Sequence, residues 1–118
     1  METKQVLILR KDLNMRKGKM CSQAAHACLG AYNRAKVVDP EALEAWENDG
    51  QTKICVSVNS EQELLDVYAT ATGLGIPASI ITDAGKTEFN GVPTKTACAL
   101  GPAESSKIDQ ITRHLPLL

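Results

Sequence analysis

Aromatic residues are scarce in this 118-residue chain, where one Trp, two Tyr and one Phe make up 3% of the total. A core with so few rings must be built from aliphatic and small side chains, mainly Ala, Val, Leu and Ile. No apolar run approaches the roughly 20 residues that a membrane-spanning helix needs. The first ten residues also hold too short an apolar stretch for a signal peptide. We therefore expect a cytoplasmic protein with no membrane partner.

Cysteine spacing of the zinc-binding kind is also absent. The four cysteines, Cys21, Cys28, Cys55 and Cys98, are well spread and form no C-x-x-C pair. Each stands among apolar or small residues, where a free thiol behaves as a small hydrophobic group. The sequence therefore predicts buried, reduced thiols rather than a metal site or a disulfide. The alternative to a structural role is a catalytic one, in which Cys21 or Cys28 forms a nucleophilic pair with His26.

Charge is almost balanced over the whole chain, at −1, but it is unevenly distributed. Residues 1–36 carry eight Lys or Arg and two Asp or Glu, whereas residues 37–66 carry one and eight. A local basic face can bind a polyanion on a molecule with no net positive charge. The same asymmetry also fits two opposite solvated faces of one small domain, so charge alone leaves both interpretations open.

Apolar runs alternate with helix-type segments, and the length suits one domain, residues 1–118, with a single core. Strands are predicted at Gln5–Leu9, Lys53–Val58, Ala78–Thr82 and Thr94–Leu100, and helices at Lys17–Ala35, Pro40–Asn48, Glu61–Thr72 and Ala103–Ile111. About eleven residues without a helical pattern join the last two strands, so we expect that pair to be antiparallel. The predicted fold is an α/β three-layer sandwich, with a mixed four-stranded sheet flanked by helices on both faces.

The first predicted helix has two distinct faces. Its small and apolar residues form the face expected to pack on the sheet: Cys21, Ala24, Ala25, Cys28, Ala31 and Tyr32. Polar residues form an adjacent stripe with helical spacing: Lys19, Ser22, Gln23, His26 and Gly30. A single helical histidine is more often structural than catalytic, so this stripe alone does not identify an active site.

Two short segments could bind an anion or a polar substrate. Lys17-Gly18-Lys19 opens the first helix, where free N–H groups and the helix dipole favour negative charge. No Walker A pattern is present, and lysines on an exposed turn are the ordinary alternative. The segment 83–87 (D-A-G-K-T) follows the third predicted strand, where α/β folds place ligands. A simple Asp/Gly turn would explain the same residues.

Several blocks in fixed order resemble the peptidyl-tRNA hydrolase 2 family. The blocks are K-Q-V-L-I-L-R-K-D-L-N-M-R-K-G-K-M-C-S-Q-A-A-H-A at 4–27, W-E-N-D-G-Q-T-K-I-C-V-S-V at 46–58, I-I-T-D-A-G-K-T-E at 80–88, T-K-T-A-C-A-L-G-P at 94–102 and I-D-Q-I-T-R-H-L-P-L-L at 108–118. The resemblance covers essentially the whole chain. It implies hydrolysis of the ester between a peptide and the 3′ ribose of tRNA, without a metal or cofactor, by a homodimer that binds the acceptor end of tRNA.

The resemblance also implies which residues surround the ester. Catalytic roles are expected for Lys17, His26, Asp83, Thr87 and Thr96, and substrate binding for Arg16, Lys19, Gln23 and Gly85. The segment between Thr87 and Thr96 is about one residue longer than usual in the family, which leaves Thr94 as the alternative to Thr96. A non-catalytic RNA-binding or protein-binding module on the same fold is the alternative function.

Overall fold

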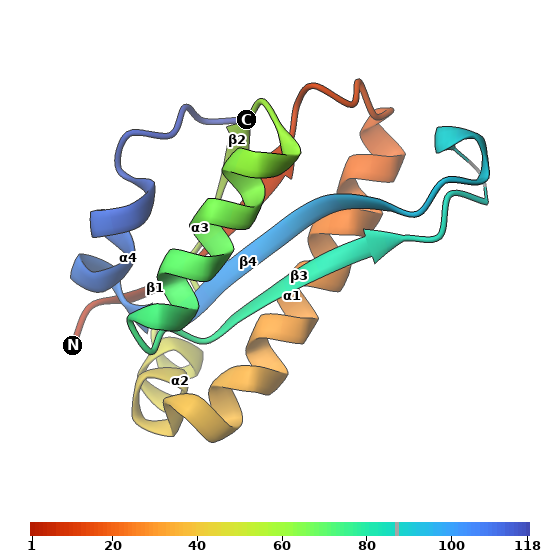
Figure 1. The fold of residues 1–118 in the computed structure, drawn as a ribbon. Coiled ribbons are helices and arrows are strands. Elements are labelled where there is room, and N and C mark those ends of the chain that lie inside the picture. Colours follow the sequence, from red (N-terminus) through yellow and green to blue (C-terminus); the bar gives the residue numbers. More distant parts are fainter. Residues whose placement is uncertain (87) are drawn as a thin grey trace.

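The computed structural model describes residues 1–86 and 88–118. In chain order its elements are β1 (Thr3–Arg10), α1 (Lys17–Val38), α2 (Pro40–Asn48), β2 (Lys53–Val58), α3 (Glu61–Gly73), β3 (Ala78–Asp83), the 3₁₀ turn η1 (Phe89–Gly91), β4 (Thr94–Glu104) and α4 (Ser105–Thr112) (Figure 1). All the predicted strands and helices are present.

The four strands form one mixed sheet in the order β2-β1-β4-β3. β1 is parallel to β2 and antiparallel to β4, and β3 is antiparallel to β4. The predicted α/β class, the mixed sheet and the antiparallel pairing of the last two strands are therefore confirmed.

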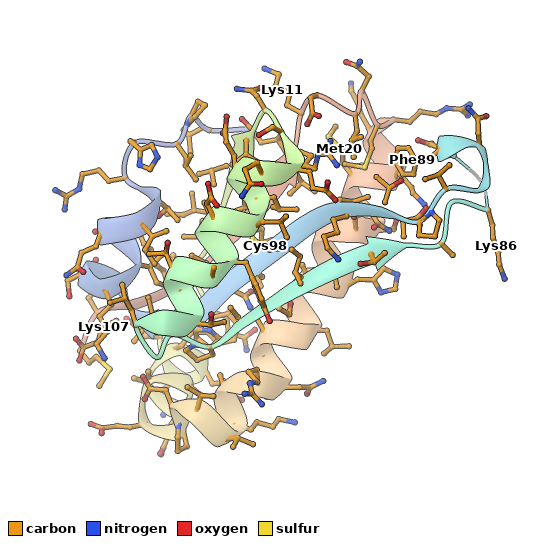
Figure 2. All side chains as sticks on the ribbon, viewed as in Figure 1. Lys11, Met20, Lys86, Phe89, Cys98 and Lys107 are labelled. Carbon is orange, nitrogen blue, oxygen red and sulfur yellow. The ribbon has the colours of Figure 1, made fainter. Side chains whose placement is uncertain are left out.

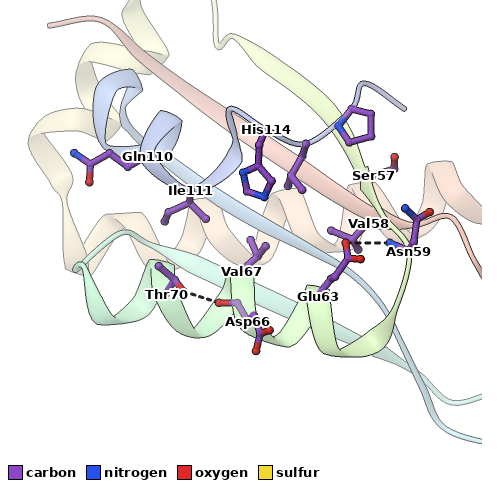
Figure 3. A pocket seen from close by; sticks show the side chains of 12 residues that line it. Ser57, Val58, Asn59, Glu63, Asp66, Val67, Thr70, Gln110, Ile111 and His114 are labelled. Atoms are coloured by element: carbon purple, nitrogen blue, oxygen red, sulfur yellow. Dashed lines mark hydrogen bonds between the residues drawn. The ribbon is translucent and has the colours of Figure 1, made fainter.

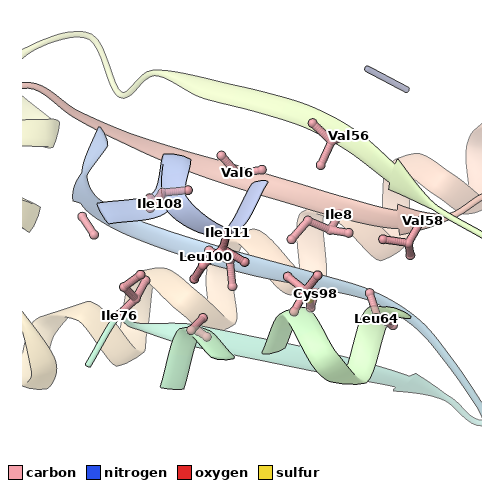
Figure 4. Packing of buried hydrophobic residues seen from close by; sticks show 14 residues of the cluster. Val6, Ile8, Val56, Val58, Leu64, Ile76, Cys98, Leu100, Ile108 and Ile111 are labelled. Carbon is pink, nitrogen blue, oxygen red and sulfur yellow. The ribbon is translucent and has the colours of Figure 1, made fainter. Parts of the chain in front are cut away.

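Helices pack on the sheet according to the alternation of side chains along β1. Val6 and Ile8 belong to a cluster that includes side chains of α3 and α4 (Figure 4). Leu7 and Leu9 belong to a second cluster, which includes Ala27 and Ala31 of α1. Since neighbouring residues of a strand point to opposite faces, α1 covers one face of the sheet and α3 and α4 cover the other. Figure 1 shows the same layering.

The core is aliphatic, as its composition predicts. The buried members of the two clusters beside the sheet are Val, Ile, Leu, Ala, Met and Cys residues. Trp46 is buried in a separate cluster with Ala35 and Leu43, where its indole N–H donates to the carbonyl oxygen of Thr52 at 2.9 Å. The single tryptophan therefore joins α1 and α2 instead of filling the space between helices and sheet.

The predicted buried face of α1 is wrong in part. The buried residues of this helix are Gln23, Ala27, Ala31 and Ala35. Cys21 and Ala25 are exposed, because α1 lies mainly over β4 and β3 and turns the side of Gln23 toward the sheet. Cys55 is exposed as well, so the prediction of buried thiols fails for Cys21 and Cys55 and holds for Cys98. All four cysteines are free in the structure.

Helix caps agree with the sequence, whereas the end of β4 does not. Asp39 accepts a hydrogen bond from the N–H of Ala42 at 3.2 Å, and Ser60 accepts one from the N–H of Glu63 at 3.0 Å. These side chains satisfy backbone donors that lack a partner inside the helix. The chain was expected to leave the sheet at Gly101, but β4 continues to Glu104 because its last residues pair with the start of β1. The last helix accordingly begins at Ser105 instead of Ala103.

The two edges of the sheet differ. The backbone of the C-terminal residues covers β2, where the N–H of Ser57 donates to Pro116 at 3.0 Å and the N–H of Leu118 donates to Cys55 at 3.1 Å. β3 forms the other edge and pairs only with β4 within residues 1–86 and 88–118.

In that same part of the chain, the helices are too short or too polar to cross a bilayer.

Candidate functional site

The candidate site lies where the carboxyl end of β3 meets the first turns of α1. A hollow of about 320 Å³ is lined there by Gln23 and His26 of α1 and by residues 80–84. It brings together two segments that are about sixty residues apart in the sequence. Both had been selected from the sequence as possible polar sites.

Asp83 joins these two segments. Its Oδ1 accepts a hydrogen bond from Nζ of Lys19 at 2.7 Å, and its Oδ2 accepts one from the N–H of Gly85 at 2.9 Å. The two paired side chains are only about 15% exposed, at 15% for Lys19 and 14% for Asp83. Charge-assisted bonds of this length hold the carboxylate in a fixed orientation at the edge of the hollow.

These contacts also set the charge of Asp83. The hydrogen bond from Lys19 lowers the pKa of this carboxyl below its usual 3.8, and the N–H of Gly85 and the positive charges of Lys19 and His26 act in the same direction. Burial opposes the shift but does not outweigh it. Asp83 is therefore a carboxylate throughout the neutral range, and it is a weak proton acceptor.

The turn after Asp83 requires glycine at position 85. Gly85 has a φ of +80°, which side-chain-bearing residues rarely adopt, and a Cβ atom there would lie 2.5 Å from the carbonyl oxygen of Val92. Its own carbonyl accepts a hydrogen bond from the N–H of Gly91 at 2.8 Å. Gly85 thus joins the chain after β3 to Gly91 through its carbonyl, and its N–H binds the carboxylate of Asp83. The bond to Asp83 is the one of these two bonds that contacts a site residue.

A β-bulge places Thr96 beneath the hollow. Ile81 pairs with Ala97 and Thr82 pairs with Lys95, so Thr96 has no residue opposite it on β3. Its hydroxyl donates to Oε1 of Gln23 at 2.5 Å, and both side chains are buried. Bulges often re-aim a side chain beside an active site. With Oε1 engaged, the Nε2 amide is the group of Gln23 that can donate into the hollow.

The remaining candidates are more exposed. His26 is on the surface of α1 and lines the hollow three residues after Gln23. Arg16 and Lys17 are exposed at the start of α1, and Arg16 lies 3.9 Å from a carboxylate oxygen of Glu88. Thr94 points its hydroxyl at the carbonyl of Val92, at 2.8 Å, and not at α1. Thr87 lies outside the residues that the structure describes.

Two basic residues close to the end of β3 were not selected from the sequence. Nζ of Lys95 donates to the hydroxyl of Thr82 at 3.2 Å, and Thr82 lines the hollow. Arg10 donates to the carbonyl of Lys95 at 3.0 Å and pairs with Asp12 at 2.7 Å. Antiparallel pairing of the last two strands could have suggested Lys95, but only with the register known.

A larger hollow, of about 570 Å³, lies on the other face of the sheet, between α3, α4 and residues 57–59 (Figure 3). It holds none of the residues selected from the sequence. Its Glu63 is engaged with the N–H of Asn59 at 3.3 Å, next to the start of α3. Nowhere in residues 1–86 and 88–118 do three His, Cys, Asp or Glu side chains come together in a group that could hold a metal ion. The smaller hollow with convergent polar groups is therefore the better candidate.

Comparisons with known proteins show the family of this chain. The family model "Peptidyl-tRNA hydrolase PTH2" matches residues 3–118. A peptidyl-tRNA hydrolase of Methanocaldococcus jannaschii is 49% identical over 98% of this chain and 99% of its own length. One of Thermococcus onnurineus is 43% identical over 98% and 97%. A probable peptidyl-tRNA hydrolase 2 of Drosophila melanogaster is 44% identical over 98% of this chain and 61% of its own length. The resemblance found in the sequence is confirmed, and this chain belongs to the peptidyl-tRNA hydrolase PTH2 family.

Proposed function

We propose that this chain hydrolyses the ester bond between a peptide and the 3′ ribose of tRNA, and so recycles peptidyl-tRNA released from ribosomes. One observation supports this function above the others. A carboxylate, an imidazole and a buried amide, on Asp83, His26 and Gln23, meet in one hollow of a chain that belongs to the family. Ester hydrolysis needs a proton acceptor for water and a donor for the oxyanion, and this hollow offers both.

In the proposed mechanism His26 accepts the proton of the attacking water. The oxygen of that water bonds to the carbonyl carbon, and the tetrahedral intermediate collapses with cleavage of the bond to the ribose 3′ oxygen. His26 then gives its proton to that oxygen. Asp83 is held as a carboxylate by Lys19 and Gly85, so it stabilises the transient imidazolium and does not itself take the proton.

Gln23 is the proposed donor to the developing oxyanion. Thr96 is fully buried and acts as a positioning residue, since its hydroxyl fixes Oε1 of Gln23 and so directs the Nε2 amide toward the hollow. A donor that is already oriented loses no free energy to reorganisation when charge develops. Thr87 is expected to contact the ribose or the carbonyl.

The basic start of the chain is the proposed contact surface for tRNA. Arg16, Lys17 and Lys19 lie within the first turn of α1 or next to it, and Lys95 donates to Thr82, which lines the hollow. Basic side chains grip phosphates with little base readout, which suits an enzyme that must act on many tRNAs. Lys17 is the proposed contact for the terminal phosphates.

A homodimer is part of the proposal, and α1 offers a surface for it. Cys21, Ala25 and Leu29 follow one another at four-residue spacing and are exposed, with Leu29 at 60%. Cys55 of β2 lies near Cys21 and is exposed too. Exposed apolar stripes of this kind mark interaction surfaces. We further propose that residues 1–118 act as one catalytic domain in the cytoplasm.

The function is tested with N-acetyl-aminoacyl-tRNA and the matching free aminoacyl-tRNA. We expect release of tRNA from the blocked form alone. The variant His26→Asn should lose this release, whereas His114→Asn should keep it, because His114 lies in the larger hollow on the other face of the sheet. Release from neither substrate would instead favour a non-catalytic module that binds RNA or protein.

A further inference from the structure

The open edge of the sheet has a composition that sheet edges usually avoid. Exposed edge strands are commonly blunted by Lys, Pro or covering backbone, because their unpaired N–H and C=O groups bind other chains. β2 is covered by the C-terminal backbone, but β3 (A-S-I-I-T-D) contains neither Lys nor Pro and pairs only with β4 in the described part of the chain. An edge left open beside a catalytic hollow is available to an extended peptide.

A second hollow continues the candidate site along this edge. It measures about 530 Å³ and lies beside the first half of β3, between α1 and α3. Arg34 of α1 and Thr72 of α3 are among the residues that line it. Ile80 lines both this hollow and the one that holds Asp83 and His26. Because Ile80 lines both, the two hollows adjoin beside β3, and together they are called the track below.

The side of α1 that borders this track has a glycine at its middle position. His26, Gly30 and Arg34 follow one another at four-residue spacing on the side of α1 next to β3. A Cβ atom on Gly30 would lie 2.9 Å from the Cβ and the hydroxyl of Ser79, so α1 approaches the strand closely here. No side chain projects from the helix at this position between the two hollows.

We propose that the last four or five residues of the substrate's peptide bind the outer edge of β3 as an added strand. This inference rests on the proposed function, because it places the scissile ester at Asp83 and His26. The peptide would run parallel to β3, since its carboxyl end must reach the carboxyl end of that strand. The six residues of β3 span about 20 Å, which sets the length of peptide that can pair.

Main-chain pairing also fits the chemistry of this substrate. Peptides released from ribosomes differ in sequence, but all of them carry the same backbone N–H and C=O groups. Strand addition takes its affinity from these groups and leaves side chains to shallow pockets. The edge of β3 would thus bind the peptide whatever its sequence, while the basic surface binds the tRNA.

The test compares substrates of different peptide length on one tRNA. N-acetyl-alanyl-tRNA reaches only the hollow of Asp83, whereas N-acetyl-tetraalanyl-tRNA also reaches the edge of β3. We expect kcat/KM to rise by about three- to tenfold for each main-chain hydrogen bond gained, and to level off beyond about five residues. N-methylation of the internal amides of the tetraalanyl substrate should remove this gain.

A pair of variants on one helix tests where the peptide binds. Thr72→Trp fills the second hollow and should lower the ratio of kcat/KM for the long over the short substrate. Thr70→Trp adds the same side chain two residues away in the larger hollow on the other side of α3, and should leave that ratio unchanged.

Two results would overturn the inference while leaving the proposed function intact. One is equal kcat/KM for the short and long substrates. The other is a length effect that N-methylation does not change. Hydrolysis of neither substrate would instead refute the proposed function, and the inference with it.

Discussion

Lys19 and Asp83 form an ion pair, with 2.7 Å between Nζ and Oδ1, that connects the first turn of α1 to the last residue of β3. The two elements supply the two sides of the candidate site, so this pair fixes their relative position. A second ion pair of the same kind, between Lys4 and Asp109, lies elsewhere in the molecule and offers a matched control.

Asp83→Asn should lower the kcat/KM for N-acetyl-aminoacyl-tRNA by about 10²-fold or more, because the neutral amide no longer stabilises the imidazolium of His26. The rate at which tRNA is released in a single-turnover assay measures the effect. Asp109→Asn breaks the control ion pair and should leave kcat/KM within about twofold of the wild type. Near-full activity of Asp83→Asn would exclude the proposed role of this carboxylate.

The ionised side chain of Asp83 should stabilise the folded protein at neutral pH, and this stabilisation should be lost in acid. Its pKa is lower in the folded chain than in the unfolded chain, so its ionised form favours the folded state. That contribution is complete above an unfolded-state pKa of about 4 and disappears as the pH falls through the folded-state pKa. Urea unfolding from pH 7 to pH 2.5 should show a difference between wild type and Asp83→Asn that is constant above about pH 5 and shrinks below 4. A difference that stays constant to pH 2.5 would contradict the assignment.

Thr96→Val should reduce both stability and kcat without a comparable change in KM. The substitution keeps the shape of the side chain but leaves the buried Oε1 of Gln23 without its donor, which costs about 1–3 kcal/mol of unfolding free energy. Gln23 would no longer be oriented, and kcat should fall by about tenfold. Thr96→Ser, which keeps the hydroxyl, should restore most of kcat. If Thr96→Val and Thr96→Ser had the same kcat, the hydroxyl would have no positioning role.

Lys17→Ala should weaken binding of deacylated tRNA and lower the salt dependence of that binding. Each lost phosphate contact reduces the slope of log Kd against log salt by about one. Fluorescence anisotropy at several salt concentrations measures the slope. Lys107→Ala is the control. Lys107 lies at the end of the molecule opposite Lys86 and Phe89, which stand between β3 and β4 next to the site (Figure 2). Equal slopes for the two variants would place the tRNA elsewhere.

Leu29→Glu should convert a dimer into a monomer. A charge in the middle of the exposed stripe on α1 would be buried without a partner in the proposed interface. Sedimentation velocity reports the mass directly. Val37→Glu puts the same charge on an even more exposed apolar residue of α1, at 78% against 60%, and should leave the mass unchanged. A wild-type protein that sediments as a monomer would rule out the interface.

The sequence was sufficient for the order of the elements, because each carries its own local signal. Asp39 and Ser60 mark helix starts, and the short aliphatic runs mark strands whose side chains alternate as observed in β1. The candidate segments around His26 and Asp83 were also found from sequence, through turn chemistry and the family resemblance. The caps, runs and turns are contained in a few neighbouring residues, whereas the resemblance depends on several blocks along the chain.

Features that depend on long-range packing were not predicted. The choice between Thr94 and Thr96 depends on one bulged residue in β4, and a pattern of period two cannot place a bulge. The buried face of α1 was placed on Cys21 and Ala25, because hydropathy disfavours burial of Gln23. In the structure Gln23 is buried because Thr96 supplies its hydrogen bond, and that partner lies 73 residues away.

The C-terminal backbone on β2 has a consequence for solubility as well as for function. A sheet with two open edges can extend in both directions, so that chance pairing between copies propagates into ribbons. Here Ser57 and Leu118 use their N–H groups to close one edge. Pairing between copies through β3 alone therefore joins two molecules. One edge can stay open beside the hollow without the sheet itself extending into a ribbon.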